Sequence, residues 1–372
     1  MNNPPSVFFA NSAILSNRVI AHAIIRLVTT LTQQCQQLHH RHWRALLLAL
    51  SLCSLQPLSA LAASQTAPTT AANEQGTATQ LKPISLMLDW FINPNHGPII
   101  IAQQLGLFAK QGLKVNISEP ADPSVPDKLV AAGKVDLAVS YPNTLIEAAA
   151  QHLPLQQVGT LISTPLNALI VLDKSNITSL SQLAGKTIGV SISGNEQASI
   201  DTMLQSAGVT PGSVKTVNVG WALSAALASG RVDAIWGGQR NFELNQLRLE
   251  GYPAHAFYPE EHGIPPFSEL IFVGKKPGLP ASVIASFNRA LEQATVFIIN
   301  HPEKAWQLFQ SYAPDTLNTE LNHKAWQDTL SHFARRPGAV SLARYNDYAR
   351  FMAKHGIISQ VPAAHDYILQ EQ

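Results

Sequence analysis

The protein has 372 residues, of which 46% are hydrophobic, enough apolar material for one large or two medium globular domains. Its 25 Lys and Arg residues nearly balance its 24 Asp and Glu residues, and the part expected to fold has no basic run. Nucleic acid is therefore excluded as a partner, because binding it requires cations that neutralise a series of phosphates. The two cysteines, Cys35 and Cys53, precede the expected fold, so the sequence predicts neither a disulfide nor thiol chemistry there.

The N-terminal part has the features of a targeting segment followed by a linker. Basic residues precede an apolar run at 45–55 and a small-residue site that ends at Ala62, which is the pattern of a signal peptide cleaved after Ala62 or Ala63. We expect export to the periplasm, and a retained membrane anchor is the alternative. The expected divisions are an extension without derivable function at 1–40, a signal peptide at 41–63 and a flexible tether at 64–80.

From residue 81 onward, short apolar runs alternate with helical stretches, which is the βαβ rhythm of parallel sheets. The rhythm occurs twice, so two α/β units are expected. The first unit comprises strands at 84–88, 113–118 and 135–140 with helices at 98–110 and 124–132. The second comprises strands at 187–192, 214–219 and 232–236 with helices at 196–206 and 222–229.

Internal sequence similarity further indicates two related lobes, because residues 130–138 resemble residues 227–235. In both segments a helix is stopped by Gly before a buried strand begins, although a chance match is the alternative. Helices expected at 281–355 pack back on the first lobe, so two chain segments form a hinge around a ligand cleft. The expected fold is α/β, with two Rossmann-like lobes: lobe one at 81–174 and 268–358, and lobe two at 175–267.

Ligands of open α/β sheets lie beyond the carboxyl ends of the strands, which directs attention to the segments that follow them. After the first strand come Asp89, Trp90, Asn93 and His96; Trp90 suits stacking on a flat ring, and Asn93 and His96 suit hydrogen bonds to its edge. The alternative is a core-capping Trp90, ordinary turn chemistry at Asn93 and a structural His96.

The third strand of the first lobe is followed by Tyr141 and Asn143 at the start of a helix. These residues offer an aromatic ring and a polar group to a ligand. A helix cap is the alternative for Asn143.

In the second lobe, Ser193, Gly194 and Asn195 lead into a helix, where free backbone amides suit a ligand oxygen, or serve an ordinary cap. The later strand ends at Trp236, and Asn241 and Glu243 follow its paired glycines. Glu243 suits an amino group of a ligand, and a solvated surface carboxylate is the alternative.

Catalytic and metal-binding motifs are missing from this sequence. The expected folded part has no cysteine, no closely spaced histidine pair, no phosphate-binding glycine loop and no hydrolase serine motif. We therefore expect no enzyme activity, no metal and no cofactor.

Several segments together resemble the thiamine-pyrimidine precursor-binding proteins, a family of solute receptors related to the fungal pyrimidine synthase. The resemblance covers residues 84–358, and its most specific part is the Trp90, Asn93 and His96 spacing. The segments that carry it are 88–91, 93–96, 106–108, 112–113, 119–124, 132–136 and 237–243.

This resemblance implies a type II periplasmic-binding fold that closes on an aminopyrimidine, with polar contacts near Asn93, Tyr141 and residues 241–243. It also implies a monomeric receptor that delivers its ligand to the permease and ATPase of an ABC importer. The synthase is said to use a histidine and a cysteine-rich motif, whereas the aligned helix here reads Tyr141 to Leu145. Receptors for sulfonates, taurine, nitrate or another heteroaromatic compound are the rivals on ligand, and a synthase or a sensor domain is the rival from another class.

Overall fold

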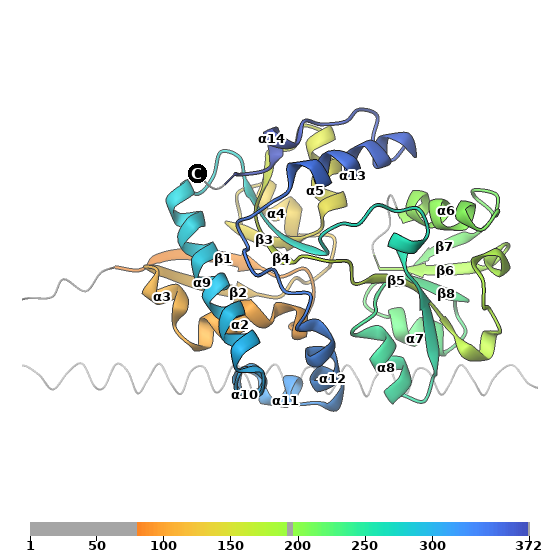
Figure 1. The fold of residues 1–372 in the computed structure, drawn as a ribbon, viewed down its shortest axis with the longest axis horizontal. Helices are drawn as coiled ribbons and strands as arrows, with labels where there is room; N and C mark the ends of the chain where they lie inside the picture. Colours follow the sequence, from red (N-terminus) through yellow and green to blue (C-terminus); the bar gives the residue numbers. More distant parts are fainter. Residues whose placement is uncertain (1–79, 192–195, 371–372) are drawn as a thin grey trace, which may run out of the picture. The chain divides into compact units, whose positions relative to one another are not determined.

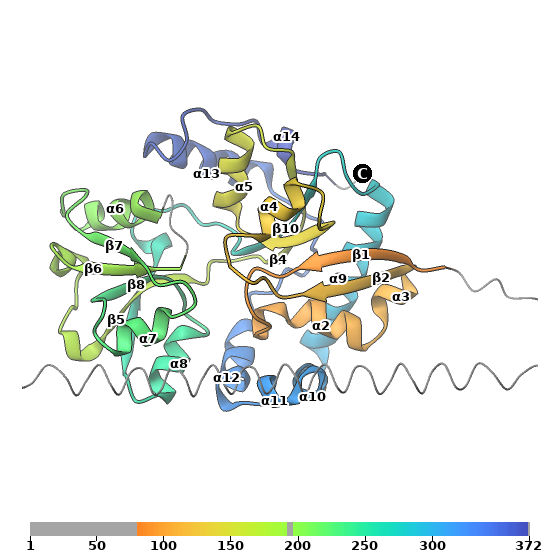
Figure 2. The ribbon, with the colours of Figure 1, turned by 180° about the vertical axis from the view of Figure 1, so that it is seen from behind.

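The structure is a computed structural model that describes residues 80–191 and 196–370. These residues form two five-stranded sheets with helices on their faces (Figures 1 and 2). The expected α/β class with two lobes is therefore confirmed. Within the same residues, no helix has the length and apolarity that crossing a membrane requires.

The first sheet has the strand order β2-β1-β3-β10-β4. Strands β1, β2 and β3 are parallel, as expected, and β3 is buried along its whole length because it lies at the centre. Strand β10 is antiparallel to both neighbours, which the sequence did not indicate. The strands are β1 (Lys82–Met87), β2 (Leu113–Ser118), β3 (Leu137–Ser140), β4 (Leu155–Ile162) and β10 (Leu270–Lys275).

The second sheet repeats this plan with the order β7-β6-β8-β5-β9. Strand β6 is parallel to β7 and β8, whereas β5 is antiparallel to β8 and β9. The strands are β5 (Asn167–Leu172), β6 (Thr187–Val190), β7 (Lys215–Asn218), β8 (Ala234–Gln239) and β9 (Ala254–Phe257).

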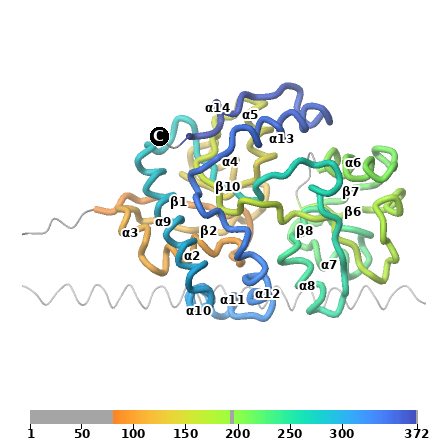
Figure 3. The backbone as a smooth tube through the Cα atoms, in the orientation of Figure 1, coloured from red at the N-terminus to blue at the C-terminus, as the bar shows by residue number. Residues whose placement is uncertain are grey.

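The chain crosses between the sheets twice, and Figure 3 shows both crossings. It leaves the first sheet after β4 through residues 163–166 and returns between β9 and β10. Strands β4 and β10 lie side by side, and because one leaves and the other returns, they run in opposite directions. The lobe boundaries expected at 174 and 268 stay a prediction.

The helices of the C-terminal part pack on the first lobe, where α9 covers α2 and α3, and α13 lies against α5 (Figure 1). Helix α9 shows why: Ile284, Phe287, Leu291 and Ile298 recur on one face of the helix and are buried in the core. The helices preceding α9 are α2 (Gly97–Gln104), α3 (Leu107–Lys110), α4 (Pro126–Ala131), α5 (Pro142–Ala150), α6 (Glu196–Ser206), α7 (Leu223–Ala228) and α8 (Glu243–Leu249). The later helices are α9 (Ala281–Asn300), α10 (Pro302–Tyr312), α11 (Pro314–Leu317), α12 (Glu320–Thr329), α13 (Leu342–Lys354) and α14 (Ala364–Tyr367), and the short 3-10 turns are η1 (Pro94–His96), η2 (Asp173–Ser175), η3 (Leu180–Leu183) and η4 (Pro259–Glu261).

Candidate functional site

The candidate site is the cleft between the two lobes, where two adjoining cavities share four lining residues. Tyr141 comes from the first lobe, and Ser191, Gly237 and Gln239 come from the second. The larger cavity has a volume of about 110 Å³. Strands β1, β3, β6 and β8 all direct their carboxyl ends towards this cleft, as expected for ligand sites of open α/β sheets.

Asp89 lies at the centre of a hydrogen-bonded group that the sequence predicted only in part. Its Oδ1 lies 2.9 Å from Nε2 of His96, and its Oδ2 accepts the hydroxyl of Tyr141 at 2.7 Å. Nδ1 of His96 accepts the backbone N–H of Asn93 at 3.2 Å, which makes Nε2 the nitrogen that donates to Asp89. Burial and the neighbouring Asp89 hold the pKa of Tyr141 well above its usual range, so its hydroxyl keeps the donated proton.

His96 is completely buried behind Asp89 and lines neither cavity. The sequence suggested that this imidazole hydrogen-bonds a ligand directly. In the structure it instead fixes Asp89, which in turn fixes the ring of Tyr141 in the cleft wall. His96 is therefore a positioning residue.

Aromatic rings from both lobes meet at the mouth of the cleft. Trp90 of the first lobe lies edge-on to Trp221 of the second, with ring centroids 4.1 Å apart. Phe91 lies tilted against Trp221 and edge-on to Phe242, with ring centroids 6.2 and 6.1 Å apart. Of these four rings, Trp90 and Phe242 line the smaller cavity, so they are placed to face a flat ligand.

Asn93 and Asn143 occupy the starts of two helical segments that face the cleft. The Oδ1 atom of Asn93 accepts the N–H of Asn95, and its Nδ2 donates to the carbonyl of Phe91, so its amide group is largely used by the turn. Both Asn93 and Asn143 line a cavity, Asn93 the smaller and Asn143 the larger.

Two buried carboxyl groups give the cleft its electrostatic character. Glu243 begins α8, and its Oε2 accepts the backbone N–H of Gln239 at 2.6 Å. Glu269 precedes β10, and its Oε2 accepts the N–H groups of Leu166 and Asn167 at 2.6 and 2.8 Å. Burial raises the pKa of each carboxyl to about 7, because desolvation outweighs the backbone hydrogen bonds.

Because the pKa values of these two carboxyls are raised, we predict that the ligand-free protein loses stability as the pH rises from about 4.5 to about 7. The unfolded chain releases both protons near the usual Glu pKa of about 4.3, whereas the folded protein holds them until about pH 7. Each group costs the folded state roughly 3 kcal/mol at high pH. Urea unfolding of the protein and of the Glu243→Gln, Glu269→Gln double variant tests this, because the variant should lose that part of the pH dependence. Equal pH slopes in the two proteins would contradict it.

Asn241 joins the lobes instead of lining either cavity. Its Nδ2 donates to Oδ1 of Asn95 and to Oγ1 of Thr329, both at 2.7 Å. Asn95 also bonds Gln239, and Asn245 of α8 donates to Asp328 of α12 at 2.7 Å. These amide contacts form an interlobe network, and Asn241, which was predicted to contact the ligand, lies at its centre.

Replacing Asn241 by Ala is expected to loosen the closed arrangement of the lobes. The change removes the donor to two buried acceptors, which costs about 1–3 kcal/mol for each group left unsatisfied. Small-angle X-ray scattering should therefore show a larger radius of gyration for ligand-free Asn241→Ala. Asn116→Ala, at an exposed position of β2, is the matched control and should scatter as the wild type does. Unchanged scattering of Asn241→Ala would show that the network does not hold the lobes together.

The remaining predicted residues of the second lobe divide into two groups. Trp236 is buried at β8 and lines the larger cavity, beside Gly237, which has a φ of +90°. A side chain at Gly237 would be strained by this φ and would project to within 3.6 Å of Oγ of Ser191, inside the cleft. The predicted residues Ser193, Gly194 and Asn195 lie outside the described residues.

Some of the cleft residues that sequence reasoning missed come from the returning crossing and from the C-terminal helix α13. Glu269 directly precedes β10, and Tyr348 and Met352 lie at helical spacing on α13, a pattern that indicates a buried face without saying what covers it. The lining residues outside the segments that the sequence singled out are Glu147, Asn167, Glu196, Ser199, Leu223, Ile264, Phe267, Glu269, Tyr348, Met352 and Ile357, and those within these segments but not predicted as contacts are Thr144, Ser191, Gly237, Gln239 and Phe242.

The described residues that line the two cavities include five carboxylic acids and neither Lys nor Arg. Arg240 is adjacent in sequence, but its guanidinium pairs with Glu260 at 2.7 Å and lies 4.0 Å from the ring centre of Tyr258. No cluster of His, Cys, Asp or Glu suited to a metal ion occurs within the described part of the chain. The cleft thus offers aromatic faces and hydrogen-bond acceptors, which suit a flat ligand with N–H donors.

Comparison with solved structures shows which fold the chain has. The alkanesulfonate-binding protein SsuA of Xanthomonas axonopodis pv. citri superposes with a TM-score of 0.63 at 17% identity, over 78% of this chain and 99% of that one. The periplasmic sulphonate-binding protein SsuA of Escherichia coli gives a TM-score of 0.59 at 15% identity, over 78% and 93%. The fold is that of the periplasmic binding proteins.

Sequence comparison identifies the family. The family described as NMT1/THI5 like matches residues 93–305, and the chain belongs to this family. A Haemophilus influenzae protein whose name places it in thiamine biosynthesis is 50% identical over 77% of this chain and 91% of its own length. The formylaminopyrimidine-binding protein of Halalkalibacterium halodurans is 31% identical over 68% and 76%. A 4-amino-5-hydroxymethyl-2-methylpyrimidine phosphate synthase of Legionella pneumophila is 30% identical over 74% and 90%.

Proposed function

We propose that this protein is the exported receptor of an ABC importer and that its cleft binds a thiamine pyrimidine precursor of the hydroxymethylpyrimidine or formylaminopyrimidine type. The observation that carries the proposal is the position of the Glu243 carboxyl group in a cavity that Trp90 and Tyr141 also line. An aminopyrimidine has a flat face for the aromatic rings and an exocyclic amino group for the carboxylate.

The acidic lining favours this ligand over an anion. A sulfonate or nitrate would be held close to Glu243 and Glu269, and the neighbouring Arg240 is engaged by Glu260. Like charges within a cleft of low dielectric repel strongly, so anion binding would require both carboxyls to be protonated. The amino group of a pyrimidine requires no such adjustment.

In this proposal, closure of the lobes completes the site. Trp90 and Trp221 approach from opposite lobes, and the amide network around Asn241 holds the closed form. The closed monomer then docks on a membrane permease that a cytoplasmic ATPase drives. The ligand leaves the receptor chemically unchanged, and no cofactor or metal takes part.

A thermal-shift screen tests the proposal, because a ligand that binds only the native state raises the melting temperature. The screen compares hydroxymethyl- and formylaminopyrimidines with thiamine, riboflavin, taurine, alkanesulfonates and nitrate. We expect a shift with the aminopyrimidines alone. A shift with taurine or an alkanesulfonate would overturn the ligand, and turnover of an added pyrimidine precursor would favour the synthase instead.

A further inference from the structure

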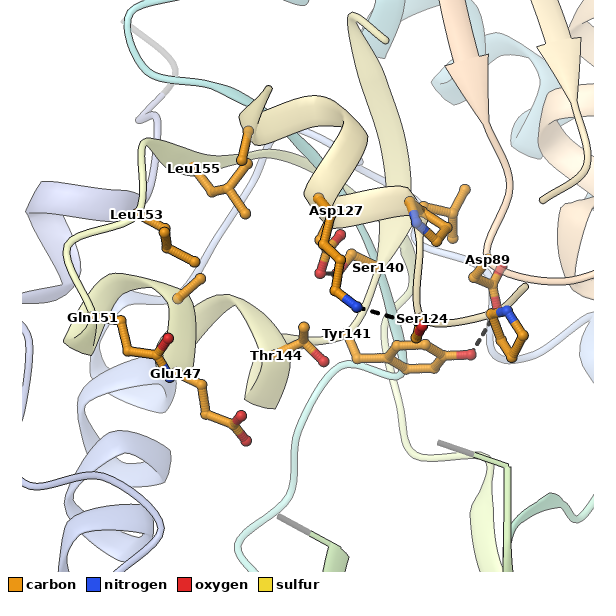
Figure 4. Close-up of a pocket in the computed structure, with 16 residues that line it drawn as sticks. Asp89, Ser124, Asp127, Ser140, Tyr141, Thr144, Glu147, Gln151, Leu153 and Leu155 are labelled. Atoms are coloured by element: carbon orange, nitrogen blue, oxygen red, sulfur yellow. Dashed lines mark hydrogen bonds between the residues drawn. The ribbon is translucent and has the colours of Figure 1, made fainter. Parts of the chain in front are cut away.

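The first lobe contains a side pocket that adjoins the cleft. It has a volume of about 480 Å³ and lies between α4 and α5 (Figure 4). Asp89 and Tyr141 line both this side pocket and the smaller cleft cavity, while Thr144 and Glu147 line both it and the larger one. The side pocket and the cleft therefore share part of their walls.

The walls of the side pocket combine apolar side chains with hydroxyl groups, an amide, one lysine and three carboxyl groups, of which that of Asp127 is distinctive. Its Oδ2 accepts the hydroxyl of Ser140 at 2.7 Å, whereas its Oδ1 is buried with no hydrogen-bond partner among the described residues. Figure 4 shows Asp127 and Ser140 together on one side of the pocket, with Thr144 and Glu147 of α5 on the other.

Among the described residues, no cation pairs with Asp127. The neighbouring Lys128 also lines the side pocket, but its side chain is exposed and its Nζ lies 3.5 Å from Oγ of Ser124. Burial, followed by the nearby Asp89, raises the pKa of Asp127 to about 6 even though Ser140 lowers it. Above that pH the side pocket holds a carboxylate with one unsatisfied oxygen, which a donor with positive charge would complement.

A purely structural role explains this arrangement less well. Asp127 stands in the first turn of α4, where an acid is favourable, but an exposed carboxylate would serve that purpose without desolvation. Within the described part of the chain, its unpaired oxygen has no partner that would offset the free-energy cost of desolvation.

We propose that the side pocket binds an amine-bearing arm of the ligand whose ring lies in the cleft, with the ammonium group on Asp127. The inference rests on the proposed function, since it places the ring between Trp90 and Glu243. It extends the ligand class from simple aminopyrimidines to aminopyrimidines that carry a short alkylamine chain. The apolar wall, which includes Val139, Ala148 and Leu155, contacts the methylene groups of that chain.

Isothermal titration calorimetry on the full chain at about pH 8, where Asp127 is ionised, tests the inference. The probes are 4-amino-5-hydroxymethyl-2-methylpyrimidine and two series on the same ring, whose short 5-alkyl chains end either in an amine or in a methyl group. The best amine probe should bind about tenfold more tightly than its methyl-ended counterpart. Asp127→Asn should remove this difference, and Asp122→Asn, a nearby exposed acid that does not line the pocket, should retain it.

The outcomes separate this inference from the proposed function. Equal binding of amine- and methyl-ended probes by the wild type overturns the inference, as does an amine advantage that persists in Asp127→Asn. If the hydroxymethyl probe still binds in those cases, the proposed function stands. If no pyrimidine binds, both fail. Asp127→Asn keeps the side-chain shape and removes a desolvated charge, so it should melt at or above the wild-type temperature; the wild-type comparison of the two probe series does not depend on that variant.

Discussion

Glu243→Gln is expected to bind aminopyrimidines roughly 100-fold more weakly than the wild type, a loss of about 3 kcal/mol. The carboxylate of Glu243 holds the N–H of Gln239 through Oε2 and is placed to accept a ligand amino group through its other oxygen. Glutamine retains the first bond by its carbonyl oxygen but directs an NH₂ group at the ligand, so donor faces donor. Titration calorimetry with a hydroxymethyl- or formylaminopyrimidine at about pH 8, where Glu243 is ionised, measures the effect.

The same substitution should stabilise the empty protein, since it removes a buried charge that is expensive to desolvate. Glu250→Gln is the matched control, because this exposed acid ends the same helix and should change neither property. Wild-type affinity in Glu243→Gln would remove Glu243 from the binding site. Loss of both affinity and stability would instead assign this carboxylate a structural role.

Trp90→Ala should weaken binding of the same ligand roughly 30-fold, or by about 2 kcal/mol. The indole lines the cavity and packs edge-on to Trp221 of the other lobe, so its removal costs both a stacking face for the ligand and a contact of the closed form. Trp90 is half-buried, outside the fully packed core, and the fold should therefore persist. Titration calorimetry is the suitable measurement, because loss of the Trp90 fluorophore would disturb a fluorescence readout.

Phe91→Ala controls for this experiment, since Phe91 is the adjacent aromatic residue, is 40% exposed and lines neither cavity. Phe91→Ala should bind the ligand with an affinity within about threefold of the wild type, because it removes only a peripheral aromatic contact. If both variants lose affinity equally, the aromatic rings act only by holding the lobes together. If neither loses affinity, ring stacking is not the basis of recognition.

The location of residues that follow the parallel strands is the part of this cleft that local sequence indicates. Polar and aromatic residues directly after a buried parallel strand, such as Trp90 and Tyr141, must lie at the carboxyl edge of the sheet, because the strand fixes where its end points. Glu243 follows the same rule after β8. For these residues, the pattern alone was sufficient to place them at the cleft.

The sequence was insufficient to predict contacts whose partners come from other segments of the fold. Asn241 turns to Asn95 and Thr329, which lie 146 and 88 residues away, and nothing in its own segment indicates either partner. His96 differs, because its partner Asp89 lies only 7 residues away, and the sequence showed both residues without indicating that they pair. Tyr348 shows the converse, because helical periodicity indicated a buried face on α13 but not that part of this face would border the cleft.

The antiparallel strands have a comparable explanation. The apolar run of β10 indicates a buried strand, yet its direction depends on the chain's returning from the second lobe beside β4. Strand direction is a property of that topology and not of the residues in the strand.

A crystal structure of the protein grown with formylaminopyrimidine tests the central claim most directly. The account predicts difference density for the ring against Trp90 in the cleft, with the exocyclic amino group within hydrogen-bond distance of Glu243. Density for the ring elsewhere, or an amino group directed away from both Glu243 and Glu269, would contradict it.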